Sequence, residues 1–480
     1  MKNNKILISL FLIIVGIGAT SCKKWIDEDI NKDPNKPEDV PMNVLLPSAE
    51  VSLAFSSGSD LNRFPSLWIQ TMSGLANQHL SFDNYNLKEG DVNNMWYFNM
   101  YGGNMSDLTV IIRKASETGS PYYGGIAKVL MANALGLMTD LWGDVPYSEA
   151  FQGTDNLKPA YDRQSKVYDE IDTLLAHAIN DLAGSPGNFI PGADDFFYGG
   201  DAAKWTMFAH SLRARYYLHH AKVDNAYYAM ALTEAAMGFG SNDDNATFNF
   251  GEKVTENGPI YQFFSVDRFG DAGVGKTLVD MMNTLNDPRR SAYFLTDGNC
   301  TPDTCYSGSA AGAGDIATSQ IGTFFNSPTS PVFMMTYSEL KFIEAECNFR
   351  NGNTTEAATA FNDAVQQSLL LFGTDNAGYI AANGSETSGT ITIEKIFNQK
   401  YIHMFCQGTE GFTDWRRSHD SSHPDGIPAL TMAAHPVTAT IPRRLPYPIS
   451  ERLQNGASLS AAISAQGGAD ITDRVWWDTN

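Results

Sequence analysis

The chain has 480 residues, of which 43% are hydrophobic, 18% charged and 11% aromatic, and this composition excludes disordered, collagen-like and coiled-coil proteins. It carries 33 Lys and Arg against 54 Asp and Glu, a formal net charge of −21, so most of its surface repels nucleic acid. Length alone allows about three domains or one extended array of repeats.

The N-terminus has the pattern of a secretory signal. Two lysines precede an apolar run at 6–19, which is too short to span a membrane, and small residues then lead into Cys22. This arrangement resembles a bacterial lipoprotein signal in which Cys22 becomes the lipidated first residue; a plain secreted chain is the alternative. We predict a signal peptide at 1–21 and, because Pro and Asn are frequent after it, a lipidated tether with irregular backbone at 22–47.

Apolar residues recur at intervals of three and four along most of the remaining chain, whereas the alternation typical of strands is scarce. The spacing predicts helices at 44–55, 96–115, 122–141, 165–182, 202–221, 226–237, 279–285, 337–350, 355–371 and 393–405. A Gly-, Ser- and Pro-rich insertion at about 238–331 separates two helical blocks. Because loops of this length in a compact domain are usually functional, we expect the ligand to bind there.

The predicted helices look like pairs. Residues 345–365 read as a helix, a Gly/Asn turn and a second helix with small residues at the crossing, which resembles a tetratricopeptide unit, and a similar rhythm runs through 96–141 and 161–221. Stacked pairs bury a continuous core only together. We therefore predict a mainly α fold, a right-handed array of tetratricopeptide-like helix pairs with long inserted loops, as a single domain at 48–480.

One segment matches a nucleotide-binding motif. Residues 270–277, GDAGVGKT, fit the phosphate-loop pattern G-x-x-x-x-G-K-[ST]. That loop needs a buried apolar strand before it, whereas Asp267 and Arg268 place charges there, and no apolar strand ending in Asp follows at a useful distance. We reject nucleotide binding and interpret 270–275 as a flexible loop that leads into a helix start.

Other patterns of catalysis and metal binding are missing from the sequence. It contains neither H-E-x-x-H nor G-x-S-x-G, and Cys347 and Cys406 fall in apolar helices, where buried thiols are inert. His419 and His423 share one loop, which sets no metal geometry. We therefore predict no enzyme, no cofactor and no metal. The turn-rich spacing of Cys300 and Cys305 allows a short loop disulfide or two free thiols.

Binding of a sugar without chemistry needs flat aromatic faces for C–H surfaces and polar side chains for hydroxyls. Such residues cluster near predicted helix ends and loops. The ligand-binding candidates are Trp68, Gln70, Asn77, Trp96, Tyr97, Tyr261, Phe264, Arg268, Tyr306 and Phe324. Core packing is the alternative for the aromatic candidates, and a contact surface for a protein partner is another, because large interfaces also enrich Tyr, Trp and Phe.

Five blocks of sequence carry a family resemblance. They are NALGLMTDLWGDVPYSE at 133–149, NDPRR at 286–290, MTYSELKFIEAE at 335–346, DWRR at 414–417 and PRRLPYP at 442–448. In this order they resemble the SusD/RagB family of outer-membrane nutrient-binding lipoproteins, and most closely its SusD-like group two. The residue types in these blocks suit structural roles. Trp142 can pack on the next helix pair, and Arg289 can bind a carboxylate or carbonyl groups. The last two blocks can form a polar, aromatic plug.

The resemblance implies a mostly α fold of tetratricopeptide-like pairs and a lipid anchor at Cys22 on the surface of a Bacteroidota outer membrane. It also implies a SusC-type TonB-dependent transporter as partner and a non-enzymatic role in nutrient uptake. We expect capture of an oligosaccharide and its delivery to the transporter. Capture of a peptide, hydrolysis of a surface glycan, and a structural lid with negligible affinity of its own are the alternatives.

Overall fold

Helices form nearly all of the regular structure. The computed structural model describes residues 40–298 and 305–479, and the residues from Met42 onward pack together as one unit. The predicted signal peptide, the lipidation site Cys22 and Cys300, one of the two cysteines of the possible loop disulfide, lie outside the described residues. In the part of the chain that is described, no helix is long and apolar enough to span a membrane.

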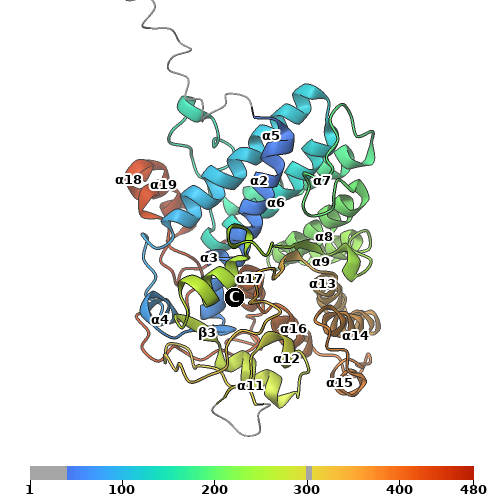
Figure 1. The fold of residues 1–480 in the computed structure, drawn as a ribbon, viewed down its shortest axis with the longest axis vertical. Helices are drawn as coiled ribbons and strands as arrows, with labels where there is room; N and C mark the ends of the chain where they lie inside the picture. Colours follow the sequence, from blue (N-terminus) through green and yellow to red (C-terminus); the bar gives the residue numbers. More distant parts are fainter. Residues whose placement is uncertain (1–39, 299–304, 480) are drawn as a thin grey trace, which may run out of the picture. The chain divides into compact units, whose positions relative to one another are not determined.

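The first helices precede the insertion and the others lie in or after it (Figure 1). The earlier set comprises α2 (Met42–Gly58), α3 (Asp60–Trp68), α4 (Asn77–Asp83), the π-helix η2 (Met95–Met105), α5 (Ser106–Thr118), α6 (Pro121–Trp142), the 3-10 helix η3 (Gly153–Asp155), α7 (Gln164–Ala183), α8 (Ala202–His220) and α9 (Ala226–Ala235). The later set comprises the 3-10 helices η4 (Asn242–Asp244) and η5 (Val254–Glu256), α10 (Pro259–Tyr261), the π-helix η6 (Gln262–Asp267), α11 (Lys276–Thr284), α12 (Arg290–Tyr293), α13 (Tyr337–Arg350), α14 (Thr354–Leu371), α15 (Ala377–Asn383), α16 (Ile393–His403), α17 (Gly408–Arg417), α18 (Ile449–Gln454) and α19 (Gly456–Gln466). The predicted helices are present, with ends that differ by a few residues, except that the helix predicted at 96–115 is divided into the π-helix η2 and the α-helix α5.

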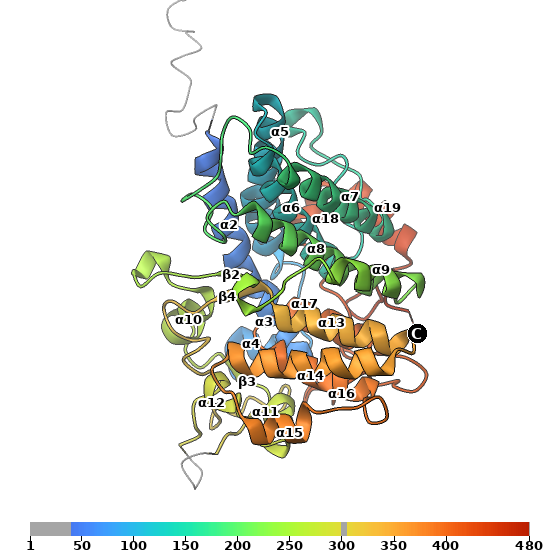
Figure 2. The same ribbon diagram turned by 90° about the vertical axis from the view of Figure 1, so that its right-hand side faces the viewer.

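Consecutive helices pack as pairs, α6 with α7, α8 with α9 and α13 with α14, and Figure 2 shows them stacked from α5 to α16. Small residues at the crossings allow the close approach: a Cβ at Gly125 would lie 2.7 Å from Cγ of Leu182, and one at Gly136 would overlap the ring of Tyr216. The predicted fold class, a mainly α array of tetratricopeptide-like pairs with long inserted loops, is confirmed.

The irregular tether predicted at 22–47 overlaps the first helix of the structure. Helix α2 starts at Met42, so residues 42–47 are helical and not part of an irregular tether. Leu45 and Leu46 are buried, and this burial favours the helix although Pro47 lies within it and lacks a backbone donor.

Two short antiparallel ladders pair distant segments. Strand β1 (Met72–Gly74) pairs with β3 (Ala272–Val274), and β2 (Ala246–Phe248) pairs with β4 (Val332–Met335). The prediction of a flexible loop at 270–275 is therefore wrong for β3, whose residues are all buried. The predicted helix start is confirmed, because α11 begins at Lys276, whose Nζ pairs with Asp280 at 2.7 Å on the exposed side of the helix.

The C-terminal segment returns to the helix pairs through the last family block. Trp142 donates from Nε1 to the carbonyl of Pro446 at 2.8 Å, and Tyr447 donates to the carbonyl of Asp144 at 2.7 Å. Arg416 donates from Nη1 to the carbonyl of Arg443 at 2.9 Å. The polar, aromatic plug predicted from these blocks is thus confirmed as part of the scaffold.

Candidate functional site

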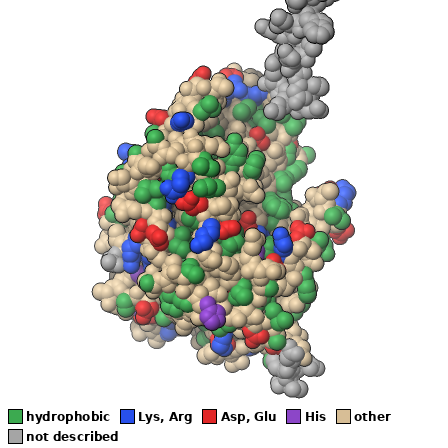
Figure 3. Space-filling model, turned by 90° about the vertical axis from the view of Figure 1, so that its left-hand side faces the viewer, with side chains coloured by type: hydrophobic (Ala, Val, Ile, Leu, Met, Phe, Trp, Pro, Cys, Tyr) green, Lys and Arg blue, Asp and Glu red, His purple; other side chains and the backbone are tan. Residues whose placement is uncertain are grey.

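A groove lies along the exposed side of α2. It consists of two adjoining hollows of about 490 Å³ and about 500 Å³, and both are lined by Val51, Phe55 and Phe196. Figure 3 shows hydrophobic side chains gathered along a hollowed edge of the surface, next to a projecting segment. A concave, partly apolar surface of this volume suits a small organic ligand such as a short oligosaccharide.

Phenylalanine rings and neutral polar groups make up most of the groove wall. The ring of Phe196 is 50% exposed, and its centroid lies 6.1 Å from that of Phe248. Phe248 in turn packs at 4.9 Å against Phe250, which meets Phe55 edge-on at 6.5 Å. The polar residues of the wall are Ser48, Ser52, Ser56, Asn99, Asn249, Thr255, Glu256, Asn257 and Gln262. Of the described residues that line the two hollows, none is Lys or Arg.

Helices and a ladder hold these side chains in place. Val51 and Phe55 are one helical turn apart, so they share a face of α2. The pairing of β2 with β4 fixes Phe248 opposite Val332. Within the loop that follows, Asn257 donates from Nδ2 to the carbonyl of Gly251 at 3.0 Å. The loop therefore presents a defined wall to α2.

The π-helix η2 forms the opposite rim. Asn99 lines the groove, and its carbonyl accepts a hydrogen bond from Ser52 Oγ at 3.3 Å. The wide turn depends on glycine, because a Cβ at Gly103 would lie 2.7 Å from the carbonyl oxygen of Phe98. π-Helical segments are often found at functional sites, and this one places Tyr97 and Phe98 on the surface, 47% and 61% exposed.

Four predicted ligand residues are buried instead. Trp68, Gln70, Trp96 and Phe264 are 0%, 2%, 2% and 6% exposed. Trp96 meets Trp142 edge-on at 5.3 Å within an aromatic cluster. A ring packed on both faces offers no surface to a sugar, and the side-chain amide of Gln70 is held by Thr277 and the carbonyl of Thr431. In this structure the four side chains are therefore part of the core and not of an open surface.

The other six predicted residues are scattered. Asn77 donates from Nδ2 to Asp271 Oδ1 at 2.6 Å. Asp271 follows Arg268 by three residues, so Asn77 lies near the segment that carries the exposed Arg268. Tyr97 lies on η2, and Tyr261 precedes the groove residue Gln262. Two of them pack elsewhere: Tyr306 lies under the Arg290 guanidinium at 5.6 Å, and Phe324 meets Phe372 at 5.1 Å.

All ten predicted residues lie in the described part of the chain, and none lines either hollow. The groove does take most of its second hollow from the predicted insertion, between Phe248 and Gln262. A signal was available there, because Phe248, Asn249 and Phe250 interleave aromatic and amide side chains in the pattern used to choose the other candidates.

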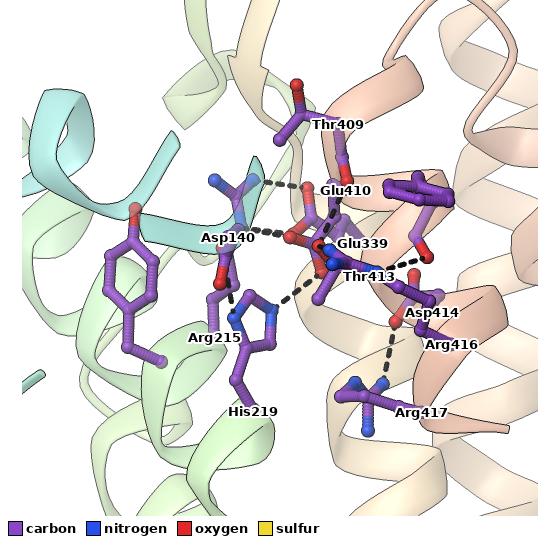
Figure 4. A network of polar contacts seen from close by, with 12 residues as sticks. Asp140, Arg215, His219, Glu339, Thr409, Glu410, Thr413, Asp414, Arg416 and Arg417 are labelled. Carbon is purple, nitrogen blue, oxygen red and sulfur yellow. Dashed lines mark hydrogen bonds and ion pairs between the residues drawn. The ribbon is translucent and has the colours of Figure 1, made fainter. Parts of the chain in front are cut away.

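Charged side chains gather in the core rather than at the groove (Figure 4). Arg215 of α8 donates from Nε and Nη2 to the two carboxylate oxygens of Glu339 in α13, each at 2.7 Å. His219 lies between Glu410 at 3.2 Å and Asp140 at 3.3 Å. Burial lowers the pKa of His219, but the two carboxylates outweigh it and raise the pKa to about 9. These charged groups compensate one another and link four helices, so their role is structural.

The histidine loop is held by two carboxylates, and the two thiols are buried. His423 contacts Asp420 and Glu394, each at 2.9 Å, and in the described residues no group of three His, Cys, Asp or Glu is arranged to hold a metal. Burial raises the pKa of the Cys347 and Cys406 thiols well above the ordinary value, so both stay protonated at neutral pH.

Comparison with known proteins adds the family context. A family model of SusD-like proteins of group two, described as "Starch-binding associating with outer membrane", matches residues 34–448. No curated protein matches the chain.

Several solved structures are similar. A chitin-binding protein shares 23% identity at a TM-score of 0.78, over 92% of this chain and 100% of its own. A SusD/RagB family protein from Bacteroides thetaiotaomicron shares 23% identity at a TM-score of 0.77, with the same coverage. A chitin-binding SusD homolog from Flavobacterium johnsoniae shares 23% identity at a TM-score of 0.76, over 92% of this chain and 98% of its own. At this identity the likeness establishes the fold.

Proposed function

Because the chain belongs to the SusD-like family of starch-binding proteins that associate with the outer membrane, we propose that it captures an uncharged oligosaccharide in the α2 groove and delivers it to a SusC-type TonB-dependent transporter. The family assignment makes it a nutrient-binding protein of the outer membrane. The transporter, the lipid anchor at Cys22 and the position on the cell surface are parts of the proposal that rest on the family resemblance.

The observation that carries the proposal is the composition of the groove wall. Exposed phenylalanine faces such as that of Phe196 suit the apolar C–H faces of pyranose rings, and the side-chain amides of Asn99, Asn249 and Gln262 suit their hydroxyl groups. A wall without Lys or Arg among its described residues favours a neutral glycan over a uronate or a sulfated one. Two similar structures are named chitin-binding, which supports N-acetylglucosamine oligomers as the first ligands to test, followed by starch fragments.

We also propose that the protein is not an enzyme. The charged residues of the core bind one another, and the groove residue Glu256 is paired with Lys253 at 2.8 Å. Most glycosidases use two carboxyl groups at a defined separation across the scissile bond. Glu256 is the one carboxyl group among the described residues that line the groove.

Calorimetric titration with neutral oligosaccharides, charged oligosaccharides and mixed peptides tests this function, with product analysis of each glycan after prolonged incubation. We expect saturable binding of a neutral glycan and no products. Binding of peptides alone would show that the ligand is a peptide and not an oligosaccharide. Products that accumulate with time would show that the protein is a hydrolase.

A further inference from the structure

Two buried carboxyl groups lie beneath the groove. Glu50, on α2 directly before the groove residue Val51, is 0% exposed, and Asp195, directly before Phe196, is 4% exposed. In the part of the chain that the structure describes, no Lys, Arg or His forms an ion pair with either group. Two ionised carboxylates buried together without a cation would be strongly destabilising. The question is therefore which of the two groups holds a proton.

The carboxyl group of Asp195 accepts four hydrogen bonds. Its Oδ1 accepts the backbone N–H groups of Phe197 at 3.0 Å and Tyr198 at 3.1 Å. Its Oδ2 accepts the N–H of Gly200 at 2.7 Å and Nε1–H of Trp205 at 2.7 Å. These four donors wrap the chain from Phe196 to Gly200 around the carboxyl group of Asp195.

Glu50 has the opposite environment. Its Oε2 accepts the N–H of Phe196 at 2.7 Å, while Oε1 is buried and accepts no hydrogen bond from the described residues. Burial, followed by the charge of Asp195, raises the pKa of Glu50 to about 10, although the hydrogen bond from the Phe196 N–H acts in the opposite direction. The charge of Asp194 raises the pKa of Glu50 by a smaller amount. Asp194 itself accepts a hydrogen bond from Tyr123 Oη at 2.6 Å.

We propose that Glu50 is a neutral carboxylic acid that donates a hydrogen bond from Oε1 to Asp195, and that this acid pair is the device that positions Phe196 in the groove. The pair shares one proton, so a single negative charge remains, and the four donors to Asp195 stabilise it. Glu50 holds the backbone N–H of Phe196 from α2, and Asp195 holds the turn behind it. Together they place the Phe196 ring where the two hollows meet.

The proposal rests on the proposed function only in making Phe196 a ligand contact. Loss of the shared proton would leave two adjacent buried negative charges and would release the turn from α2. Glu50→Gln is the matched variant, because its amide can accept from Phe196 and donate to Asp195 without a proton that titrates.

Linkage predicts the direction of the pH effect. The pKa of Glu50 is higher in the folded protein than in the unfolded chain, so the unfolded chain loses this proton at a lower pH. The stability of the folded state therefore falls as the pH rises from the ordinary carboxyl pKa of 4.5 towards the folded-state pKa of about 10. Between about pH 5 and 9 one linked proton raises the unfolding constant up to about tenfold per pH unit. Glu50→Gln removes that dependence and leaves other groups unchanged.

The test compares wild type, Glu50→Gln and Glu50→Ala by denaturant unfolding and by native-state hydrogen exchange between pH 5 and 10. We expect Glu50→Gln to be more stable than wild type above pH 6, by a factor in the unfolding constant that grows with pH, and to keep the Phe196 amide protected. Glu50→Ala should lose at least about tenfold of that protection at every pH.

A Glu50→Gln variant that is less stable than wild type at pH 8, or that keeps the wild-type pH slope, would overturn the proposal. If Glu50→Ala does not fold, the Glu50→Gln comparison still decides the question. These readouts need no ligand, so a failure of glycan binding in every variant would contradict the proposed function and leave the acid pair standing.

Discussion

Arg417 donates two parallel hydrogen bonds to Glu346, from Nη1 to Oε1 at 2.8 Å and from Nη2 to Oε2 at 2.9 Å, and so joins α17 to α13. Both side chains are 2% exposed. Removing the guanidinium would leave Glu346 charged and unpaired in the interior. We expect Arg417→Met to lower the free energy of unfolding by ~3–5 kcal/mol, measured in urea. Arg113→Met, which breaks an exposed pair with Glu117, is the control and should have little effect. Equal effects of the two changes would refute a structural role for the buried pair.

A substitution at Trp96 distinguishes a role in core packing from a role in ligand binding. Its ring is 2% exposed and contacts Trp142 and Tyr447. We expect Trp96→Ala to destabilise the fold by ~3–5 kcal/mol while the folded fraction keeps its glycan affinity. The neighbouring Tyr97→Ala, at a half-exposed position, should change stability by less than ~0.5 kcal/mol. A stable Trp96→Ala protein that has lost only binding would restore Trp96 as a ligand residue.

His79 makes the fold sensitive to acid. Its ring lies among Phe64, Phe82 and Phe263, and neither ring nitrogen has a hydrogen-bond partner in the described residues. Burial, with smaller effects of Arg63 and Arg268, lowers the pKa of His79 to about 3. The unfolded chain therefore takes up a proton first, and stability falls as the pH drops from the ordinary value of 6.5 towards 3.

We expect His79→Leu to be at least as stable as wild type at pH 7 and to lose less stability on acidification, with a difference of up to about 1.4 kcal/mol per pH unit below pH 6.5. Urea unfolding at several pH values between 4 and 7 measures this. Parallel pH profiles for the two proteins would show that His79 does not titrate in this range.

Cys22 carries the proposed membrane anchor. We expect Cys22→Ser to move the protein from the membrane fraction to the soluble fraction after export, because the lipid chains would be absent. Mass spectrometry of the wild-type N-terminus should show the lipid on Cys22. A Cys22→Ser protein that still sediments with membranes would indicate anchorage by another element.

The helices were predictable because their apolar residues face one core at helical spacing. The spacing at 122–141 and 355–371 identified α6 and α14 almost to their ends. Three-residue strands were not predictable, since β3 has no alternating pattern and is fixed only by its partner β1. Pro47 favoured an irregular tether, and the tertiary burial of Leu45 and Leu46 overrode that local preference.

The groove was not predictable residue by residue. Residue type identifies aromatic side chains but does not tell which ring faces are covered, so Trp68 and Trp96 looked like ligand residues. The members of the groove come from α2, η2, the turn at Phe196 and the loop after β2, and only the tertiary fold brings them together. The insertion was identified as a place to look, but the contribution of Phe55 and Phe196 from outside it was missed.

The most direct test of the groove is the affinity of Phe196→Ala for its best neutral oligosaccharide, measured by calorimetry on the mature chain with Cys22→Ser. Phe189→Ala is the matched control, because Phe189 is 56% exposed, lies in the same connection and lines neither hollow. We expect Phe196→Ala to bind about tenfold more weakly, ~1.4 kcal/mol, with unchanged helicity, and Phe189→Ala to bind like wild type. Equal affinities of the two variants and wild type would contradict the α2 groove as the ligand site.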